Sequence, residues 1–161
     1  LDPYYLSWKA REYGFHTSMI ESSMMVNDKM AAYCVGRASR ILNKAKKSLN
    51  GSNILLLGVA YKQYIDDYRE SPAIRVINEL LPTGATVDFY DPYIEEYMDD
   101  GKVFQGLKEV TSEVIASYDL VMITTGHTNV DYQMVQRSAK AIFDTKNAMK
   151  DIKERDNIEV L

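Results

Sequence analysis

The segment Tyr61–Pro72 of this 161-residue chain concentrates the side chains best suited to binding a charged ligand. Lys62 follows an apolar run, and Arg69 lies two residues before Ser71-Pro72, a pair that is typical of a helix start. The free backbone N–H groups of a helix N-terminus attract anions, and two cations converging on them suit a diphosphate. Tyr61 adds a flat ring that can stack on a base or pack against a sugar.

A surface loop with solvated salt bridges is the alternative interpretation of the same segment. Asp66, Asp67 and Glu70 stand among the cations and partly neutralise them. This mixture favours a selective site over a general basic patch, and on the residues alone both interpretations stay open.

Three residues outside this segment are further candidates, each with a simpler alternative. Lys146, in FDTKN, can reach the same ligand from a later strand. Asp91 follows another strand, where acidic residues often meet a ribose, but the Asp-Pro sequence there favours a turn or a helix cap. His127, in TTGHTN, is a ligand contact or an ordinary loop residue.

Residues 1–50 are predicted to be helical throughout. Asp2-Pro3 is a sound helix start in which Asp2 would be a plain cap, and Gly14 ends that short helix. From residue 18 to residue 49 apolar positions keep three-and-four spacing, and an unbroken helix there would be about 48 Å long. We therefore predict either a kinked helix or a scaffold that crosses between domains or subunits. Cys34 lies on the apolar stripe, which indicates a buried, inert thiol.

After residue 50 the pattern changes to strands alternating with helices. Strands are predicted at Asn53–Val59, Ala85–Tyr90, Leu120–Thr125, Ala141–Asp144 and, as a last edge strand, Asn157–Leu161. Helices are predicted at Pro72–Leu81, Val110–Ser117 and Tyr132–Lys140. This alternation is typical of an α/β fold with a parallel, doubly wound sheet. The chain thus divides into a helical segment, 1–50, and an α/β domain, 51–161.

The carboxyl ends of parallel strands meet at one edge of the sheet, where ligands bind in such folds. We therefore expect the cationic groups of Lys62, Arg69 and Lys146 to share one hollow and to hold a pyrophosphate there. If the three groups pointed to different sides of the molecule, this interpretation would fail.

The composition argues against several functional classes. With 26% charged residues and a net charge of −4, the chain lacks the basic excess of a sequence-independent nucleic-acid binder. No apolar run approaches the roughly 20 residues that span a bilayer, so neither nucleic acid nor a membrane is expected as a partner. Two histidines and one cysteine, far apart, have no metal-ligand spacing, and a single cysteine fits a reducing cytoplasm. The chain begins with leucine, which suggests a piece of a longer protein.

Several segments resemble the UDP-glucose/GDP-mannose dehydrogenase superfamily. The stretch GVAYKQYIDDYRESPA is similar to a motif of its C-terminal, UDP-binding domain, and FYDP, FDTKN and VND agree with three further stretches of the family. The opening DPYYLSWKAREYGFHT resembles the sequence just after the catalytic cysteine in the UDP-N-acetylglucosamine 6-dehydrogenase branch. The resemblance covers essentially the whole chain.

The resemblance implies a Rossmann-like UDP-binding domain, preceded by a helical segment with one long connecting helix through which a homodimer forms. Members oxidise the C6 hydroxyl of a nucleotide sugar to a carboxylate with two NAD⁺, which a separate N-terminal domain holds. By position, Asp2 matches an aspartate that assists the water steps. Tyr61 and Lys62 match substrate contacts, Lys146 matches a substrate-binding arginine, and Arg69 matches an arginine that reaches towards NAD.

The resemblance favours UDP-N-acetylglucosamine as the substrate of the whole enzyme, with UDP-N-acetylmannosamine and UDP-glucose as alternatives, and a product used for surface polysaccharide. The catalytic cysteine and the NAD domain would lie before residue 1, so the chain by itself is predicted to be inactive. Two other classes stay open: a stand-alone nucleotide-binding or regulatory module, and a dimerising scaffold.

Overall fold

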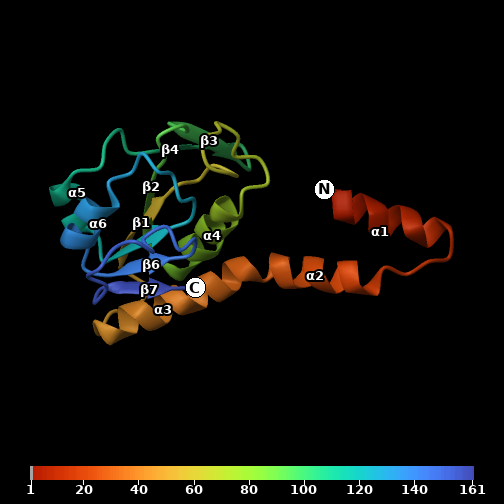
Figure 1. Cartoon of the computed structure of the whole chain (residues 1–161), viewed down its shortest axis with the longest axis horizontal. Coiled ribbons are helices and arrows are strands. Elements are labelled where there is room, and N and C mark those ends of the chain that lie inside the picture. Colours follow the sequence, from red (N-terminus) through yellow and green to blue (C-terminus); the bar gives the residue numbers. More distant parts are fainter. Residues whose placement is uncertain (1) are drawn as a thin grey trace.

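A parallel sheet of five strands forms the centre of the body in the computed structural model, which describes residues 2–161 (Figure 1). Its order is β2-β1-β5-β6-β7, so the first strand lies inside the sheet and later crossovers lie on both sides of it. The strands are β1 (Asn53–Leu57), β2 (Thr86–Tyr90), β5 (Leu120–Ile123), β6 (Ile142–Asp144) and β7 (Ile158–Val160). The predicted α/β class, the parallel pairing and the last edge strand are confirmed.

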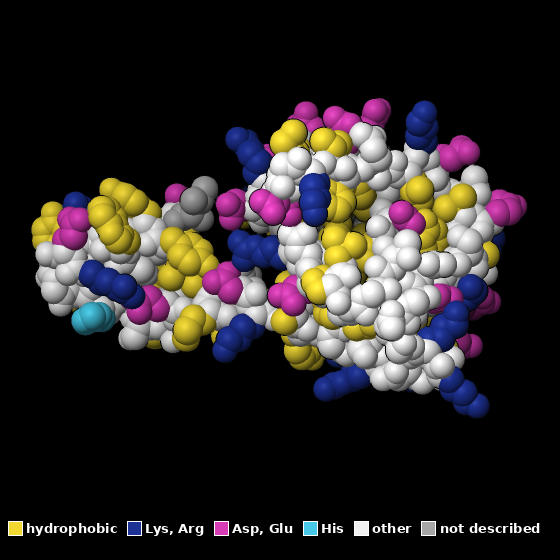
Figure 2. Space-filling view, turned by 180° about the vertical axis from the view of Figure 1, so that it is seen from behind, with side chains coloured by type: hydrophobic (Ala, Val, Ile, Leu, Met, Phe, Trp, Pro, Cys, Tyr) yellow, Lys and Arg dark blue, Asp and Glu magenta, His cyan; other side chains and the backbone are white. Residues whose placement is uncertain are grey.

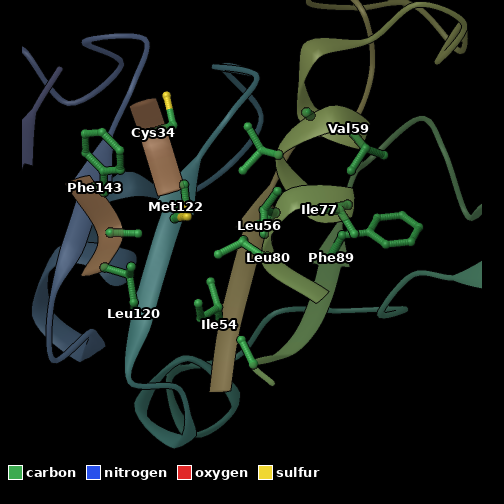
Figure 3. Close-up of a cluster of buried hydrophobic side chains, with 14 of the residues drawn as sticks. Cys34, Ile54, Leu56, Val59, Ile77, Leu80, Phe89, Leu120, Met122 and Phe143 are labelled. Atoms are coloured by element: carbon green, nitrogen blue, oxygen red, sulfur yellow. The ribbon is translucent and has the colours of Figure 1, made fainter. Parts of the chain in front are cut away.

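Successive residues of the strands face opposite sides of the sheet, and each side has its own apolar cluster. On one side Ile54, Leu56, Leu120, Met122 and Phe143 pack beneath α3 (Met30–Lys44) and α4 (Pro72–Leu80) (Figure 3). On the other side the alternate residues of the same strands meet α5 (Ser112–Ser117) and α6 (Tyr132–Ser138). Burial on both faces explains why these strands are continuous apolar runs.

The helical segment projects from this body and is only partly joined to it (Figure 1). It begins with α1 (Asp2–Glu12) and α2 (Ser18–Asp28), and α3 follows α2 end to end after Lys29 alone. The five buried residues of α3 belong to the core of the sheet, whereas none of residues 18–28 is buried. Figure 2 shows hydrophobic side chains gathered over the projecting part. The division at residue 50 stays a prediction, but α3 and the sheet share one core.

The long predicted helix is shorter than expected and is divided. The break is at Lys29, and the helix ends at Lys44 rather than at residue 49. Lys46 adopts a left-handed conformation with φ of 58°, and the amide of Lys47 donates to the Leu42 carbonyl at 3.0 Å. These bonds form a Schellman ending, which satisfies the last carbonyls and turns the chain away from the helix axis.

An antiparallel hairpin, β3 (Glu96–Asp99) and β4 (Lys102–Gln105), interrupts the predicted alternation after β2. Its two-residue turn has positive φ at Asp100 (45°) and Gly101 (73°), as a type I′ turn requires. The Asp-Gly pair between short strands is the sequence signal that could have identified it. A short 3-10 helix, Leu81–Thr83, completes the regular elements of the described residues.

Candidate functional site

The carboxyl ends of β1 and β5 lie unusually close, and Gly58 makes this possible. A Cβ atom at residue 58 would lie 2.5 Å from the carbonyl oxygen of Thr125, and the backbone there has φ of +89°. The Thr124 hydroxyl donates to the Gly58 carbonyl at 2.6 Å, and the Thr125 hydroxyl donates to the Ala60 carbonyl at 2.7 Å. The loop after β5 therefore braces the first residues of the loop after β1.

That bracing brings Tyr61 and Lys62 next to Lys146. The three residues line one hollow of about 470 Å³ together with neighbouring loop residues, among them Gly126. The Lys62 ammonium lies 5.5 Å from the centre of the Tyr61 ring, and the Tyr61 side chain is about half exposed. Two cationic side chains from different strand ends thus share a space with one aromatic ring, as the sequence predicted for these three residues.

Lys146 is held in place by a buried carboxylate at the end of β6. Asp144 is fully buried and accepts hydrogen bonds from the backbone amides of Lys146 (3.0 Å), Ala148 (3.1 Å) and Met149 (2.8 Å). The Thr145 hydroxyl adds a bond of 2.7 Å to the Ile123 carbonyl. The backbone of Lys146 is therefore fixed, while its side chain is exposed and lines the hollow. The FDTKN motif pointed to Lys146 but not to this role of its aspartate.

Lys146 also lines a second hollow, of about 330 Å³. Its wall includes Tyr61, the first residues of α4 and Arg75 in the first turns of that helix. Ser71 caps α4 by accepting from the Ala73 amide at 3.3 Å, which confirms the predicted Ser-Pro helix start. Arg75 was missed by sequence reasoning, although its place three residues after Pro72 puts it near the helix N-terminus.

Arg69 does not join Lys62 and Lys146, so the expectation that three cations share one hollow is wrong. It lines neither of the hollows described above. Its guanidinium instead donates to both carboxylate oxygens of Asp67, at 2.9 and 2.8 Å, and its side chain is 83% exposed. Hydrogen bonds from Arg69 hold the pKa of Asp67 at about 2. The reason is local, because Asp67 lies only two residues away and forms a bidentate pair with the Arg69 guanidinium in place of a distant contact.

Asp2 lies at the exposed start of α1 and lines a third hollow, of about 820 Å³, between α1, α2 and the body. Most of this wall is apolar, but Asn27 and Tyr61 also belong to it. Tyr61 therefore borders all three hollows, and Asn27 borders two of them. Asp2 and Lys62 therefore line different hollows, and Tyr61 borders both of these hollows.

Arg75 connects the projecting helices to this region. It donates to Asp28 at the end of α2 (2.9 Å) and to Glu70 (3.4 Å), and the Tyr4 hydroxyl of α1 donates to the same Asp28 at 2.7 Å. The hydrogen bond from Tyr4 is the main cause that lowers the pKa of Asp28. One carboxylate thus joins α1, α2 and α4 beside the second hollow.

Three further candidates are buried rather than open to a ligand. Asp91 accepts from the Tyr93 amide at 2.9 Å, so the predicted Asp-Pro turn is confirmed. His127 belongs to the loop after β5, as the alternative interpretation expected, but it is fully buried there and lies against Asp91. Cys34 of α3 is buried at the wall of the second hollow, and burial raises the pKa of its thiol, as expected of an inert cysteine.

Neither a metal site nor a membrane span is found in the described part of the chain. Within residues 2–161 no group of three or more histidine, cysteine, aspartate or glutamate side chains is arranged to hold a metal ion. The helices of those residues include none that is both long and apolar enough to cross a bilayer.

The chain is similar to one protein family over more than half its length. Residues 55–151 match the profile of the UDP-glucose/GDP-mannose dehydrogenase family, UDP binding domain. The UDP-N-acetyl-D-glucosamine 6-dehydrogenase of Pseudomonas aeruginosa is 27% identical over 152 residues, which are 91% of this chain and 36% of that protein. The UDP-N-acetyl-D-mannosamine dehydrogenase of Pyrococcus horikoshii is 28% identical, over 93% of this chain and 34% of its own length.

Solved structures agree with this similarity. The NDP-N-acetyl-D-galactosaminuronic acid dehydrogenase of Methanosarcina mazei Go1 superposes with a TM-score of 0.80 at 22% identity, over 99% of this chain and 36% of that one. The UDP-N-acetyl-mannosamine dehydrogenase Cap5O of Staphylococcus aureus gives a TM-score of 0.68 at 26% identity, over 99% and 35%. The chain spans about a third of the length of the curated relatives it matches.

Proposed function

Because the chain belongs to the UDP-glucose/GDP-mannose dehydrogenase family and contains its UDP-binding domain, we propose that it holds the UDP half of the substrate in a UDP-sugar 6-dehydrogenase. The observation that carries this proposal is the shared hollow of Lys62, Lys146 and Tyr61 at the carboxyl ends of β1 and β6. The second hollow also contains Tyr61 and Lys146 and adds Arg75, but the Arg75 guanidinium is already paired with Asp28 and Glu70.

The chemistry of the hollow fits a nucleoside diphosphate. The two lysine ammonium groups that line this hollow can each bind one phosphate of a diphosphate. The capped start of α4, with its favourable helix dipole, borders the second hollow, which Tyr61 and Lys146 also line. The exposed face of Tyr61 can stack on the base or pack against the sugar. Lysine at position 146 supplies a point charge rather than the two-pronged fork of an arginine, so the diphosphate keeps some freedom of orientation there.

The residues of this domain do not fit a dinucleotide. The connection from β1 to α4 lacks the G-x-G-x-x-G turn: counted from Gly58, Ala60 and Gln63 stand at the positions of the second and third glycines, which would let a pyrophosphate approach the backbone. NAD, which supplies the oxidising power of the family reaction, would therefore be held mainly by another domain. Arg69 is the residue we assign to NAD contact, since its side chain is exposed and does not line the diphosphate hollow.

Asp2 is assigned the role of assisting water in the catalytic steps, and the third hollow, which both Asp2 and Tyr61 line, supports this. The chain has a single cysteine, Cys34, and it is buried with a raised pKa, so it cannot serve as the nucleophile of the reaction. We therefore propose that these 161 residues bind UDP but do not turn over substrate alone. NADH formation by this chain with a UDP-sugar and NAD⁺ would contradict that.

UDP-N-acetylglucosamine is the substrate we favour for the whole enzyme, on the resemblance of the α1 sequence. UDP-N-acetylmannosamine and UDP-glucose are the alternatives, and relatives with each of these names match the chain. A homodimer through α2 and α3 and a cytoplasmic location belong to the same proposal. The exposed apolar side chains of the projecting helices support the dimer.

Calorimetric titration with UDP tests the binding proposal directly. Lys62→Ala and Lys146→Ala should each weaken UDP binding by about tenfold or more, because each removes a charge-assisted hydrogen bond. Lys102→Ala changes an exposed lysine of β4 that lines none of the three hollows, so this variant is the matched control and should leave the affinity unchanged. Equal binding by all four proteins, or no binding by any, would refute the diphosphate site.

A dimerising scaffold is the second candidate, and the exposed apolar surface of α1 and α2 favours it. Residues such as Trp8 (57% exposed) and Met19 (84% exposed) lie on this surface. A scaffold needs the helices and not the lysines, so it predicts self-association that changes of Lys62 leave intact, together with no affinity for UDP.

A further inference from the structure

Two buried side chains outside the hollows hold the backbone that carries Tyr61 and Lys62. Asp91, just beyond β2, is 5% exposed, and its Oδ2 atom accepts from the amides of Val59 at 2.7 Å and Ala60 at 2.9 Å. These two amides are the last ones before Tyr61. The carboxylate therefore anchors the start of the segment 59–64.

His127 anchors the other end of that segment. It comes from the loop after β5, is 0% exposed and lies against the ring of Tyr93 at 5.1 Å between centroids. Its Nδ1 atom accepts from the Tyr64 amide at 3.4 Å, and its Nε2 atom lies 3.1 Å from Oδ2 of Asp91. One imidazole thus joins Tyr64 to the same carboxylate that holds Val59 and Ala60.

The bonds determine the tautomer of His127. A backbone amide can only donate, so the Nδ1 atom that faces Tyr64 carries a lone pair and no proton. The ring proton then lies on Nε2, from which it is donated to Asp91. A ring with the proton on Nδ1, or with both nitrogens protonated, would direct an N–H group at the Tyr64 amide and lose that anchor.

The anchored segment needs such support because its backbone is strained. Tyr64 has a φ of +65°, a left-handed conformation that is uncommon for a bulky residue. The Tyr64 hydroxyl lies 2.8 Å from that of Thr128, and the Gln63 side chain donates to the Gly126 carbonyl. Tyr64 and Gln63 are therefore both bonded to the loop that carries His127. Strain of this kind persists where the surroundings hold it in place, and such places are often binding sites.

We propose that Asp91 and His127 are positioning residues of the UDP site: they fix both ends of segment 59–64 and thereby place Tyr61 and Lys62 opposite Lys146, without touching the ligand themselves. This inference rests on the proposed function for its ligand, but the anchoring can be measured without one. The pair acts through the neutral imidazole with its proton on Nε2.

The first measurement uses the 161-residue chain without ligand. Nitrogen-15 spectra of the imidazole should show the Nε2–H tautomer, and amide exchange at Tyr64 should speed up about tenfold in His127→Ala. His127→Asn puts an acceptor oxygen near the place of Nδ1 and should restore the protection of Tyr64. An Nδ1–H or doubly protonated ring, or unchanged exchange in His127→Ala, would overturn the proposal.

The second measurement is UDP affinity. His127→Ala should weaken UDP binding by about tenfold, and His127→Asn should recover most of that loss. Combined with Lys62→Ala, the loss should be less than the product of the two single losses, since His127 acts through the segment that carries Lys62. Fully multiplicative losses would overturn the positioning role.

Asp119→Asn is the matched control for general destabilisation. Asp119 is a buried carboxylate at the opposite end of β1, where it accepts from the Asn53 amide at 3.1 Å. This variant should lower stability yet keep UDP affinity within about twofold; a loss as large as that of His127→Ala would overturn the proposal. If the wild-type chain bound no UDP, the proposed function would fail, and the exchange and tautomer results would still decide whether the pair anchors the segment.

Discussion

Replacement of Gly58 by alanine tests the close approach of strand ends on which the binding region depends. The added methyl group would meet Thr125 at three atoms, with the carbonyl oxygen at 2.5 Å and the amide nitrogen at 2.8 Å. Because two of these atoms are backbone, no side-chain rotation relieves the contact. Alanine is also disfavoured at the left-handed φ of +89°, which lowers the free energy of unfolding further.

The size of the effect follows from a comparison with Gly51. That glycine also has a positive φ, +79°, but a Cβ atom there would meet nothing within 4 Å. Gly51→Ala should therefore lose only the backbone contribution, about 1–2 kcal/mol of unfolding free energy. Gly58→Ala should lose that amount plus about 1–3 kcal/mol for the steric overlap.

Urea unfolding followed by circular dichroism measures both variants. The urea concentration at the unfolding midpoint should fall further for Gly58→Ala than for Gly51→Ala. The dependence of the unfolding free energy on urea concentration should stay unchanged in each variant. UDP affinity should fall in Gly58→Ala alone, because only residue 58 leads into the segment of Tyr61 and Lys62. If the two variants lost the same stability, or had the same effect on UDP binding, the proposed role of Gly58 in the close approach of β1 and β5 would be refuted.

Three further predictions concern charge and burial. The hydrogen bond from Lys44 is the main cause that holds the pKa of Glu159 below its ordinary value of 4.5. The stabilisation from this pair is therefore present above pH 4.5 and is lost as the pH falls through the folded-state pKa. Amide exchange of β7 should rise in acid, and the rise should be smaller in Glu159→Gln. Arg69→Ala should raise the pKa of Asp67 from about 2 towards 3.8 in an NMR titration, while UDP affinity stays within about twofold; a large loss of affinity would show that Arg69 reaches the ligand after all. Cys34 should react slowly with a thiol reagent until denaturant is added, and rapid labelling of the folded chain would contradict its burial.

Much of the fold was predictable because its signals are local or periodic. The apolar runs of β1 and β5 indicate strands buried on both faces, and the Ser71-Pro72 pair marks the start of α4 by its own capping chemistry. The strand-helix alternation then leaves few topologies other than a parallel sheet. These features depend on neighbours in sequence, which a single sequence displays.

The errors arose where local competition decided the outcome. Arg69 pairs with Asp67, two residues away, instead of turning into the hollow. The long helix ends at Lys44 because Lys46 adopts a left-handed conformation, which a lysine in the sequence does not predict. The Asp-Gly turn of the β3–β4 hairpin was visible in the sequence and was overlooked.

The roles of Asp91, His127 and Asp144 lie beyond what the sequence displays. Each is a polar residue next to a strand end, and by type each resembles a ligand contact. The structure shows instead that all three are buried and bonded to backbone amides or to one another. Burial cannot be read from residue type, because it depends on which distant segments cover a side chain.

The order of residues by itself determined that this chain forms a parallel α/β sheet with cationic and aromatic side chains at one edge, since periodicity and capping act over a few residues. Only the tertiary structure decided which of those side chains meet: Lys62 and Lys146 share a hollow beside Tyr61, and Arg69 does not. The physical reason is that contacts between loops some 80 residues apart depend on strand order, on the close approach that Gly58 allows and on buried carboxylates that hold the backbone.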